Sequence, residues 1–330
     1  MTETPNLTGQ AKIWPLSWIR SLRHNPIILK ELRGRMRSWR ALFNVALYVG
    51  LLSIFATLTY AISVPRTDYY NSYYSYSYYN NDYERLGSNI FSAIIGVQLL
   101  LIVLLAPGFT SGVISGEKER QTYEILLLTL LQPAEIVFGK LLSTLAYLFL
   151  LIIAALPVES IVFLVGGVGA DQLIIGLIVP LVTTLTLGTL GVMWSSLLRT
   201  SGRASRATYI SMVVLVLGLP ALAIPLSLLS YGFRGGSDSG DLMLYWASAF
   251  NPGVAVISTN ELLISHNSRT TEHNIFYYLD NGYIYPMPWL VFLVAALVLS
   301  TIFTLLAIRF VKPLKTDGDL KFRGKKKPAK

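Results

Sequence analysis

The chain has 330 residues, of which 53% are hydrophobic and 14% charged, and its mean hydropathy is +0.54. Soluble domains carry about 25% charged residues, so this composition excludes an ordinary soluble protein. The absence of cysteine excludes a disulfide scaffold, a thiolate metal site and a cysteine nucleophile, and a net charge of +9 makes the positions of the basic residues informative.

Residues 1–40 are predicted to form a tail that ends in an amphipathic helix over 25–40. Asn25 can cap this helix, and Pro26 suits its first turn. Apolar side chains then recur at helical spacing, and basic side chains fall largely on the other faces: Ile28, Leu32, Met36 and Trp39 against Lys30, Arg33, Arg37 and Arg40. Such a helix lies in the plane of a membrane interface. A juxtamembrane stop signal without a partner is the alternative interpretation.

Six apolar stretches that follow are each long enough to cross a bilayer as a helix. They cover about 41–64, 88–114, 141–165, 173–198, 207–229 and 287–311. The stretches are too long and too continuously apolar for the strands of a membrane barrel. The sequence therefore predicts an all-α integral membrane protein with a six-helix transmembrane domain over 41–311 and a basic tail over 312–330.

The basic residues predict the orientation of these helices. With both termini in the cytoplasm, eight Lys and Arg lie in 1–40, three in 115–140, three in 199–206 and nine from residue 309 onward, which leaves four on the other side. This distribution follows the positive-inside rule. It also favours anionic lipid headgroups over nucleic acid as the partner of the basic tail.

Two long connections are predicted on the outer side. The first, over 65–87, carries eight tyrosines and is interpreted as an interfacial or mobile loop, with a binding cap as the alternative. The second, over 230–286, contains two apolar pieces too short to span, so we expect two short helices dipping into the outer leaflet, separated by Asn251-Pro252-Gly253. His266 and His273 also lie there, but their spacing matches no strong metal-binding template.

Motifs for catalysis are absent from the sequence. It has no G-x-x-x-x-G-K-[ST], no H-E-x-x-H and no G-x-S-x-G, so no catalytic, cofactor-binding or metal-ligating residue is assigned. Glu159 is the one acid well inside a span, and intramembrane carboxylates are functional candidates by default. A substrate path through Gln98, Glu159, Thr183 and Thr186 is one hypothesis, and packing between helices, aided by the small residues Gly188 and Gly191, is the other.

The segment between the second and third spans carries the main signal. Charged residues over 115–124 lead into an amphipathic stretch, and Ile136-Val137-Phe138-Gly139-Lys140 precedes the third span. A short rod with ionic groups at its start and an apolar strip behind it suits docking to a soluble partner. A bare linker would not need so long a segment of this kind.

Here the sequence resembles the permease subunits of type 2 ATP-binding-cassette exporters. The amino-terminal run from Asn25 to Arg37 follows their Asn-Pro-x-x-x-Lys-Glu-x-Arg-x-Arg-x-Arg pattern. The loop matches their Glu-x-Glu-x-Gly-Thr-x-Glu-x-Leu-Leu-x-Thr-Pro pattern from Glu117 onward, except that Gln121 replaces a glycine and Leu130 a proline. With six spans and a large last outer loop, the resemblance covers nearly the whole chain.

The resemblance implies a permease that pairs with a second permease chain, identical or different, in a prokaryotic plasma membrane with both termini in the cytoplasm. A separate ATPase subunit would bind ATP and Mg²⁺, and this chain would bind no cofactor of its own. The amino-terminal helix and the 117–131 segment would form the docking surface for that ATPase. The implied docking residues are Lys30, Glu31, Arg33, Arg37, Glu117, Glu119, Arg120, Thr122, Glu124 and Leu127.

Two other functions stay open at this point. The first is a secondary transporter driven by an ion gradient, with Glu159 as the coupling acid. The second is a membrane scaffold or assembly subunit that binds through its tyrosine-rich loop. Neither the resemblance nor the residues identify the transported substrate.

Overall fold

A computed structural model describes residues 39–64, 76–123, 133–165, 168–218, 221–222, 225, 251–264, 276–278 and 284–311. The longest helices are α3 (Trp39–Ser63), α4 (Tyr76–Thr110), α7 (Pro133–Val165), α8 (Ala170–Leu197) and α13 (Pro288–Val311). Shorter elements are α5 (Ser115–Glu119), α9 (Ser201–Val213), the π-helix η1 (Val214–Gly218), α12 (Pro252–Ile264), β1 (Phe276–Tyr278) and β2 (Ile284–Pro286). The predicted amphipathic helix over 25–40 lies almost entirely outside the described residues.

In the described part of the chain, five helices are long and apolar enough to cross a membrane. They correspond to the predicted spans over 41–64, 88–114, 141–165, 173–198 and 287–311. The predicted span over 207–229 begins as α9 and continues as η1, and most of its remainder lies outside the described residues. Six spans therefore remain a prediction, whereas the largely helical, multi-pass architecture is confirmed.

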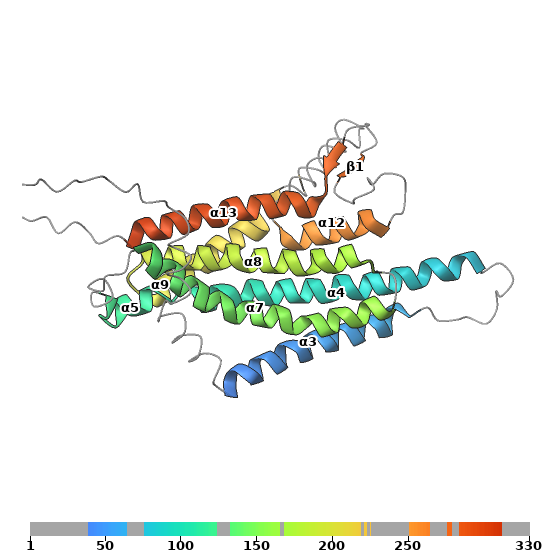
Figure 1. Cartoon of the computed structure of the whole chain (residues 1–330), viewed down its shortest axis with the longest axis horizontal. Coiled ribbons are helices and arrows are strands. Elements are labelled where there is room, and N and C mark those ends of the chain that lie inside the picture. Colours follow the sequence, from blue (N-terminus) through green and yellow to red (C-terminus); the bar gives the residue numbers. More distant parts are fainter. Residues whose placement is uncertain are drawn as a thin grey trace, which may run out of the picture.

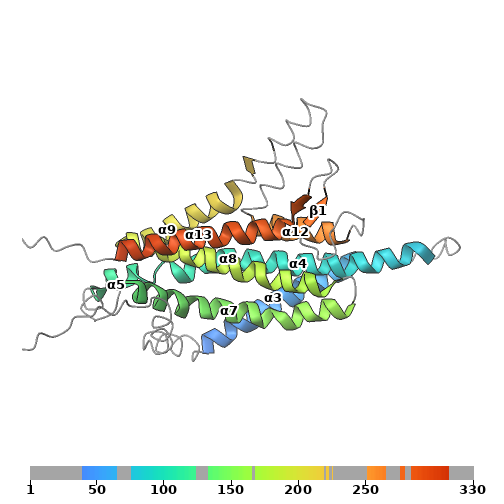
Figure 2. The same ribbon diagram turned by 45° about the horizontal axis from the view of Figure 1, so that its top comes forward.

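The long helices form one elongated bundle (Figure 1). Helix α8 is its central member and packs against α13, α4, α7, α9 and α12. Helices α3 and α13 lie at opposite edges of the bundle in Figure 1, α9 rises beyond α13 in Figure 2, and α3 packs against α4 and α7. Because α3 has few neighbours, most of its large apolar side chains are exposed, as on a face that meets lipid.

Helix direction places the polar connections at the two ends of the bundle. One end of the bundle carries α5 and is called the α5 end (Figure 1). The C-termini of α4, α8 and α13 and the N-termini of α7 and α9 lie at this end. Helix α12 and the two strands lie toward the opposite end, hereafter the outer end. The segments that the charge pattern assigned to one side of the membrane, 115–140, 199–206 and the end of the last span, thus meet at one end of the bundle.

Three expectations about local structure were wrong. Helix α4 starts at Tyr76, so the second half of the tyrosine-rich segment continues a span instead of forming a loop. Helix α7 starts at Pro133 rather than near 141, because proline is well tolerated in the first turn of a helix. The chain is also not purely α-helical, since β1 and β2 pair antiparallel with Tyr277 opposite Tyr285. Alternating aromatic residues around Asn281-Gly282, a pair typical of hairpin turns, are a signal that could have predicted this ribbon.

Helix α12 is the second of the two predicted short helices, and the first lies outside the described residues. The Asn251 side chain accepts hydrogen bonds from the backbone N–H groups of Gly253 and Val254, at 2.9 and 3.1 Å, which caps α12. Along α12, the Asn260 amide donates to the hydroxyls of Ser88 and Ser92 on α4 at 2.7 and 2.8 Å. These bonds bury α12 among the spans at the outer end of the bundle.

Candidate functional site

The start of α5 is held by a serine from another helix. The backbone N–H groups of Ile114 and Ser115 both donate to Ser195 Oγ on α8, each at 2.9 Å. The first N–H groups of a helix have no partner within it, and Ile114 provides no side-chain cap of its own. Ser195, which belongs to the neighbouring helix α8 and is fully buried, therefore caps the N-terminus of α5.

The first two charged residues of α5 face the bundle. The Glu117 carboxylate pairs with Lys140 Nζ on α7 at 3.2 Å and accepts a hydrogen bond from the Thr122 hydroxyl. Lys118 Nζ donates to the Ser196 carbonyl at the end of α8 and lies 5.3 Å from the centre of the Tyr123 ring. These side chains hold α5 in place.

The following residues face outward and end the helix. Glu119 is exposed, and its carboxylate accepts hydrogen bonds from the hydroxyl and the backbone N–H of Ser201, the first residue of α9. An acid in this place also complements the positive end of the α9 dipole. Arg120 and Gln121 are exposed at the tip.

Gln121 adopts a left-handed conformation, with φ at 59°. Its N–H bonds to the Lys118 carbonyl at 3.2 Å and the Thr122 N–H to the Glu117 carbonyl at 3.0 Å, which is the Schellman pattern at a helix end. Glycine is the residue that this pattern favours, because a side chain is strained at positive φ. The turn thus forms here without its preferred residue.

Tyr123 connects this segment to a fourth helix. Its hydroxyl donates to the Val311 carbonyl at the end of α13, at 3.0 Å. Burial raises the pKa of the Tyr123 phenol above its ordinary value of 10, so the hydroxyl stays protonated and able to donate at neutral pH. We call Glu117, Lys118, Glu119, Tyr123 and Ser195 the α5 clasp, because together they link α5 to α7, α8, α9 and α13.

Close packing supports the clasp on the membrane side. A Cβ built on Gly188 would lie 2.5 Å from Leu145 Cδ2 on α7, and one built on Gly191 would lie 2.8 Å from Thr110 Cβ on α4. At Gly191 a side chain would also meet the Ser111 backbone, so glycine is required for α8 and α4 to approach this closely, whereas at Gly188 the Leu145 side chain would have to shift. The expectation that Gly188 and Gly191 permit tight helix packing is confirmed.

A second polar group lies deep in the bundle. Tyr48 on α3, Gln98 on α4 and Glu159 on α7 are 3%, 0% and 1% exposed, and Gln98 lies within electrostatic reach of the other two. The Gln98 amide is near enough to both neighbours for a hydrogen bond, yet Tyr48 Oη, both polar atoms of Gln98 and both carboxyl oxygens of Glu159 make none of regular geometry among the described residues. We call these three residues the buried cluster. Each unsatisfied buried group costs about 1–3 kcal/mol.

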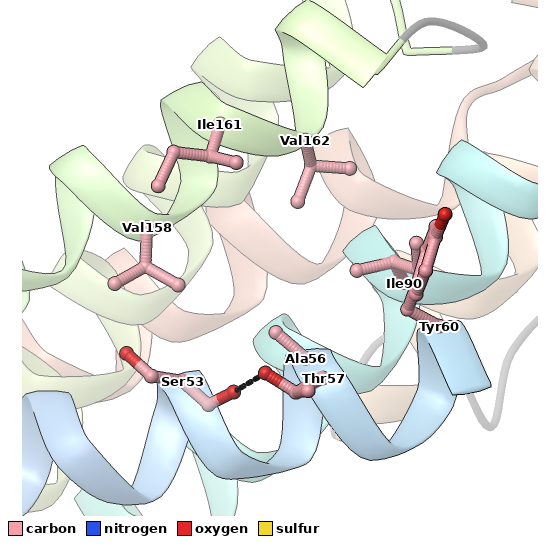
Figure 3. A pocket seen from close by; sticks show the side chains of 8 residues that line it. All are labelled: Ser53, Ala56, Thr57, Tyr60, Ile90, Val158, Ile161 and Val162. Atoms are coloured by element: carbon pink, nitrogen blue, oxygen red, sulfur yellow. Dashed lines mark hydrogen bonds between the residues drawn. The ribbon is translucent and has the colours of Figure 1, made fainter.

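A groove lies between α3 and α7 (Figure 3), and one of its lining residues, Val158, precedes Glu159 in the chain. Its volume is about 240 Å³, and the residues lining it are Ser53, Ala56, Thr57, Tyr60, Ile90, Val158, Ile161 and Val162. The Ser53 and Thr57 hydroxyls donate to carbonyls of their own helix, at 2.9 and 2.8 Å, which leaves the walls predominantly apolar. We call this feature the outer groove. Tyr60 and Ile161 are half exposed, so it opens on the surface that faces lipid.

The structure brings together only part of the predicted substrate path. Gln98 and Glu159 are neighbours, as expected of a common site. Thr183 and Thr186 are buried on α8 but donate to the carbonyls of Val179 and Val182 one turn earlier, and Thr186 also contacts the Ala296 carbonyl on α13 at 3.2 Å. Thr186 thereby links α8 to α13, whereas the hydrogen bond of Thr183 stays within α8.

The predicted docking residues are also only partly described. Glu117, Glu119, Arg120 and Thr122 lie together at the α5 end, whereas Lys30, Glu31, Arg33, Arg37, Glu124 and Leu127 lie outside the described residues. Sequence reasoning missed Tyr48 and Ser195. A phenol in the middle of an apolar span was a usable signal for Tyr48, but no local pattern marks a serine that caps another helix.

Comparison with known proteins gives one clear match. A search of curated proteins found none that matches the chain. A family model, described as an ABC-2 family transporter protein, matches residues 25–312. This match spans most of the chain and includes all five described candidate spans.

Proposed function

Because the chain belongs to the ABC-2 transporter family, we propose that it is the permease subunit of an ATP-binding-cassette exporter, driven by an ATPase on a separate chain. The family consists of membrane subunits that are not themselves ATPases. The protein is accordingly a multi-pass membrane protein that works in a transporter. Export, alternating access, a second permease chain, the plasma membrane and cytoplasmic termini belong to the proposal.

The α5 clasp is the observation that carries the proposed mechanism. A soluble ATPase can drive transport only if it binds two states of the permease with different affinity and its movement reaches the spans. Helix α5 is linked to α7 through Glu117 and Lys140, to α8 through Ser195, and to α9 through Glu119. A force applied to α5 therefore acts on several spans at once.

The proposed docking surface is narrower than the sequence implied. Glu117 and Lys118 are engaged within the permease, so they position α5 rather than meet the partner. Glu119, Arg120 and Gln121 are exposed and are the described groups that can contact an ATPase. Basic residues of the amino-terminal tail, Lys30, Arg33 and Arg37 among them, complete the proposed surface.

A co-purification experiment tests this docking. The permease is co-expressed with a Walker-motif ATPase encoded beside it, and the ATPase retained per permease is measured for the wild type and for Arg120→Glu. We expect the variant to retain at least about tenfold less, since reversal of a charge in a specific interface costs more than 1.4 kcal/mol. Arg206→Glu, which reverses an exposed arginine on α9, is the matched control and should retain the ATPase.

Two results would contradict the proposal. Equal loss in Arg120→Glu and Arg206→Glu would mean that α5 has no special part in docking. Recovery of no ATPase with the wild-type chain would remove the basis for an ATP-driven transporter. In both cases the melting temperature of each variant shows whether it is folded.

The buried carboxyl of Glu159 favours one other function, a secondary transporter driven by an ion gradient. The energy source for transport distinguishes the ATP-driven exporter from the secondary transporter. Transport that stops when the partner ATPase carries an inactive Walker motif, and continues when a protonophore collapses the proton gradient, supports the exporter. The opposite pattern supports the secondary transporter. A scaffold role predicts no transport in either condition.

A further inference from the structure

The polar atoms of the buried cluster have no hydrogen bond of regular geometry among the described residues. These atoms are Tyr48 Oη, Gln98 Oε1 and Nε2, and Glu159 Oε1 and Oε2. Hydrocarbon chains offer no donors or acceptors, so lipid cannot satisfy them. Buried polar groups in native structures are nearly always satisfied, by protein, water or a ligand. The cluster therefore has donors and acceptors to offer to a further polar group.

The charges around Glu159 indicate what that ligand carries. Residues 41–64, 86–114 and 141–165, which contain the helical parts around the cluster, include no Lys or Arg. On α7, the nearest basic residue is Lys140, which pairs with Glu117 and is 19 residues, about 28 Å, from Glu159 along the helix. A carboxyl here is satisfied either by its own proton or by a cationic donor from outside the chain.

A protonated amine fits the geometry of the buried cluster. Its N–H groups are donors only, whereas the Glu159 carboxylate and Gln98 Oε1 together offer three acceptor oxygens. A charge-assisted hydrogen bond to a carboxylate is stronger than a neutral one, and more so away from water. Tyr48 closes the cluster on the α3 side.

The outer groove fits an apolar body attached to that amine. It starts at Ser53, five residues or about 7.5 Å past Tyr48 along α3, and Val158 and Val162 flank Glu159 on α7. An apolar chain in the groove (Figure 3) would thus lie about one and a half helical turns from Tyr48 along α3. We propose that the buried cluster and the outer groove form a binding site for cationic amphiphiles, molecules with a protonated amine and an apolar body, which enter from the membrane between α3 and α7.

Helix α3 is the element that opens this site. Of its described large side chains, only Tyr48 and Leu52 are buried, and α3 packs mainly against α4 and α7. A small displacement of α3 away from α7 therefore uncovers Glu159 while it breaks few contacts. The inference depends on the proposed transport function only in treating the bound amphiphile as cargo.

Direct binding tests the proposal on the full-length permease in nanodiscs, without an ATPase. Tritiated dodecylamine is the probe, and dodecanol of equal chain length is its neutral counterpart. We expect saturable binding of dodecylamine above the level of empty nanodiscs and weak, non-saturable uptake of dodecanol. Glu159→Gln, which keeps the side-chain shape, should weaken dodecylamine binding at least tenfold, because a charge-assisted bond is lost. Ser160→Ala, next to it on the lipid-facing side of α7, should bind like the wild type.

A second variant separates loss of the site from loss of the fold. Ala56→Phe fills the outer groove with a ring and leaves the cluster intact, so it should also weaken dodecylamine binding while the melting temperature is retained. Equal affinity of Glu159→Gln and the wild type, or saturable binding of dodecanol as tight as that of dodecylamine, would overturn the proposal. Because no ATPase is present in this binding assay, a negative result would not contradict the docking proposal. Likewise, a negative co-purification result would not contradict binding of dodecylamine.

Discussion

The α5 clasp and the buried cluster are both polar, yet they differ in how their polar groups are satisfied. At the α5 end, cross-helix partners satisfy the described charged side chains of the clasp, and Ser195 alone satisfies two backbone N–H groups. In the buried cluster, five polar atoms at almost zero exposure have no described partner. The clasp is satisfied by described residues of this chain, whereas the cluster leaves polar atoms that the proposed ligand would satisfy. Substitutions in the two regions should therefore affect stability very differently.

The largest effect is expected at Ser195. Ser195→Ala removes the only described acceptor of the Ile114 and Ser115 N–H groups, and two unsatisfied buried donors should destabilise the fold by about 2–4 kcal/mol. Thermal unfolding in detergent micelles measures the loss. Ser160→Ala, whose hydroxyl bonds only to its own helix, is the control and should change stability by less than about 0.5 kcal/mol. Equal melting temperatures for the two variants would mean that water replaces Ser195.

A smaller effect is expected from the Glu117–Lys140 pair. Lys140 is 5% exposed in its side chain and Glu117 34%, so solvent screens the pair in part. A double-mutant cycle with Glu117→Gln and Lys140→Met should give a coupling energy of about 0.5–1 kcal/mol. The cycle removes contributions from other contacts of Lys140. A coupling energy near zero would mean that the Glu117–Lys140 ion pair does not stabilise the protein, and it would contradict the proposed link between α5 and α7.

A gain of stability is expected at Gln121. The left-handed conformation costs an L-residue about 1–2 kcal/mol, and glycine loses about 0.5–1 kcal/mol through its greater freedom in the unfolded chain. Gln121→Gly should therefore stabilise the α5 end by about 0.5–1 kcal/mol. Arg120→Gly is the matched control: at φ −84° it has no strain to relieve and should not stabilise. A gain in both variants, or in neither, would contradict the account of this turn.

No loss of stability is expected in the buried cluster. Tyr48→Phe removes a buried hydroxyl that has no described partner, so without ligand the variant should be as stable as the wild type or more stable, by up to about 1–3 kcal/mol. Tyr147→Phe removes another buried, unpartnered hydroxyl from α7 and should behave alike. Added dodecylamine should then raise the melting temperature of Tyr147→Phe and wild type more than that of Tyr48→Phe. A large loss at Tyr48 without ligand would show that its hydroxyl has a partner within the protein.

Much of the architecture follows from the sequence because a bilayer imposes length and apolarity on every span. The spans over 41–64, 173–198 and 287–311 agree with α3, α8 and α13 to within a few residues. The boundaries at Tyr76 and Pro133 were missed because a helix continues beyond the hydrocarbon core, where hydropathy gives no signal. Gln121 shows the reverse case. The sequence motif marked a position where the resembling family has glycine, and the structure gives the reason, a positive φ.

The sequence by itself determined that the chain is a multi-pass membrane protein and predicted that its basic segments lie on one side, because local apolarity and charge decide insertion. It also identified Glu159 as unusual, since a carboxyl in a span is costly wherever it points. Only the tertiary structure decided that Tyr48 and Gln98 join Glu159, that Thr186 bonds to α13 instead, and that Ser195 caps α5. These are contacts between residues far apart in the chain, and the packing of the helices, which no local pattern encodes, brings them together.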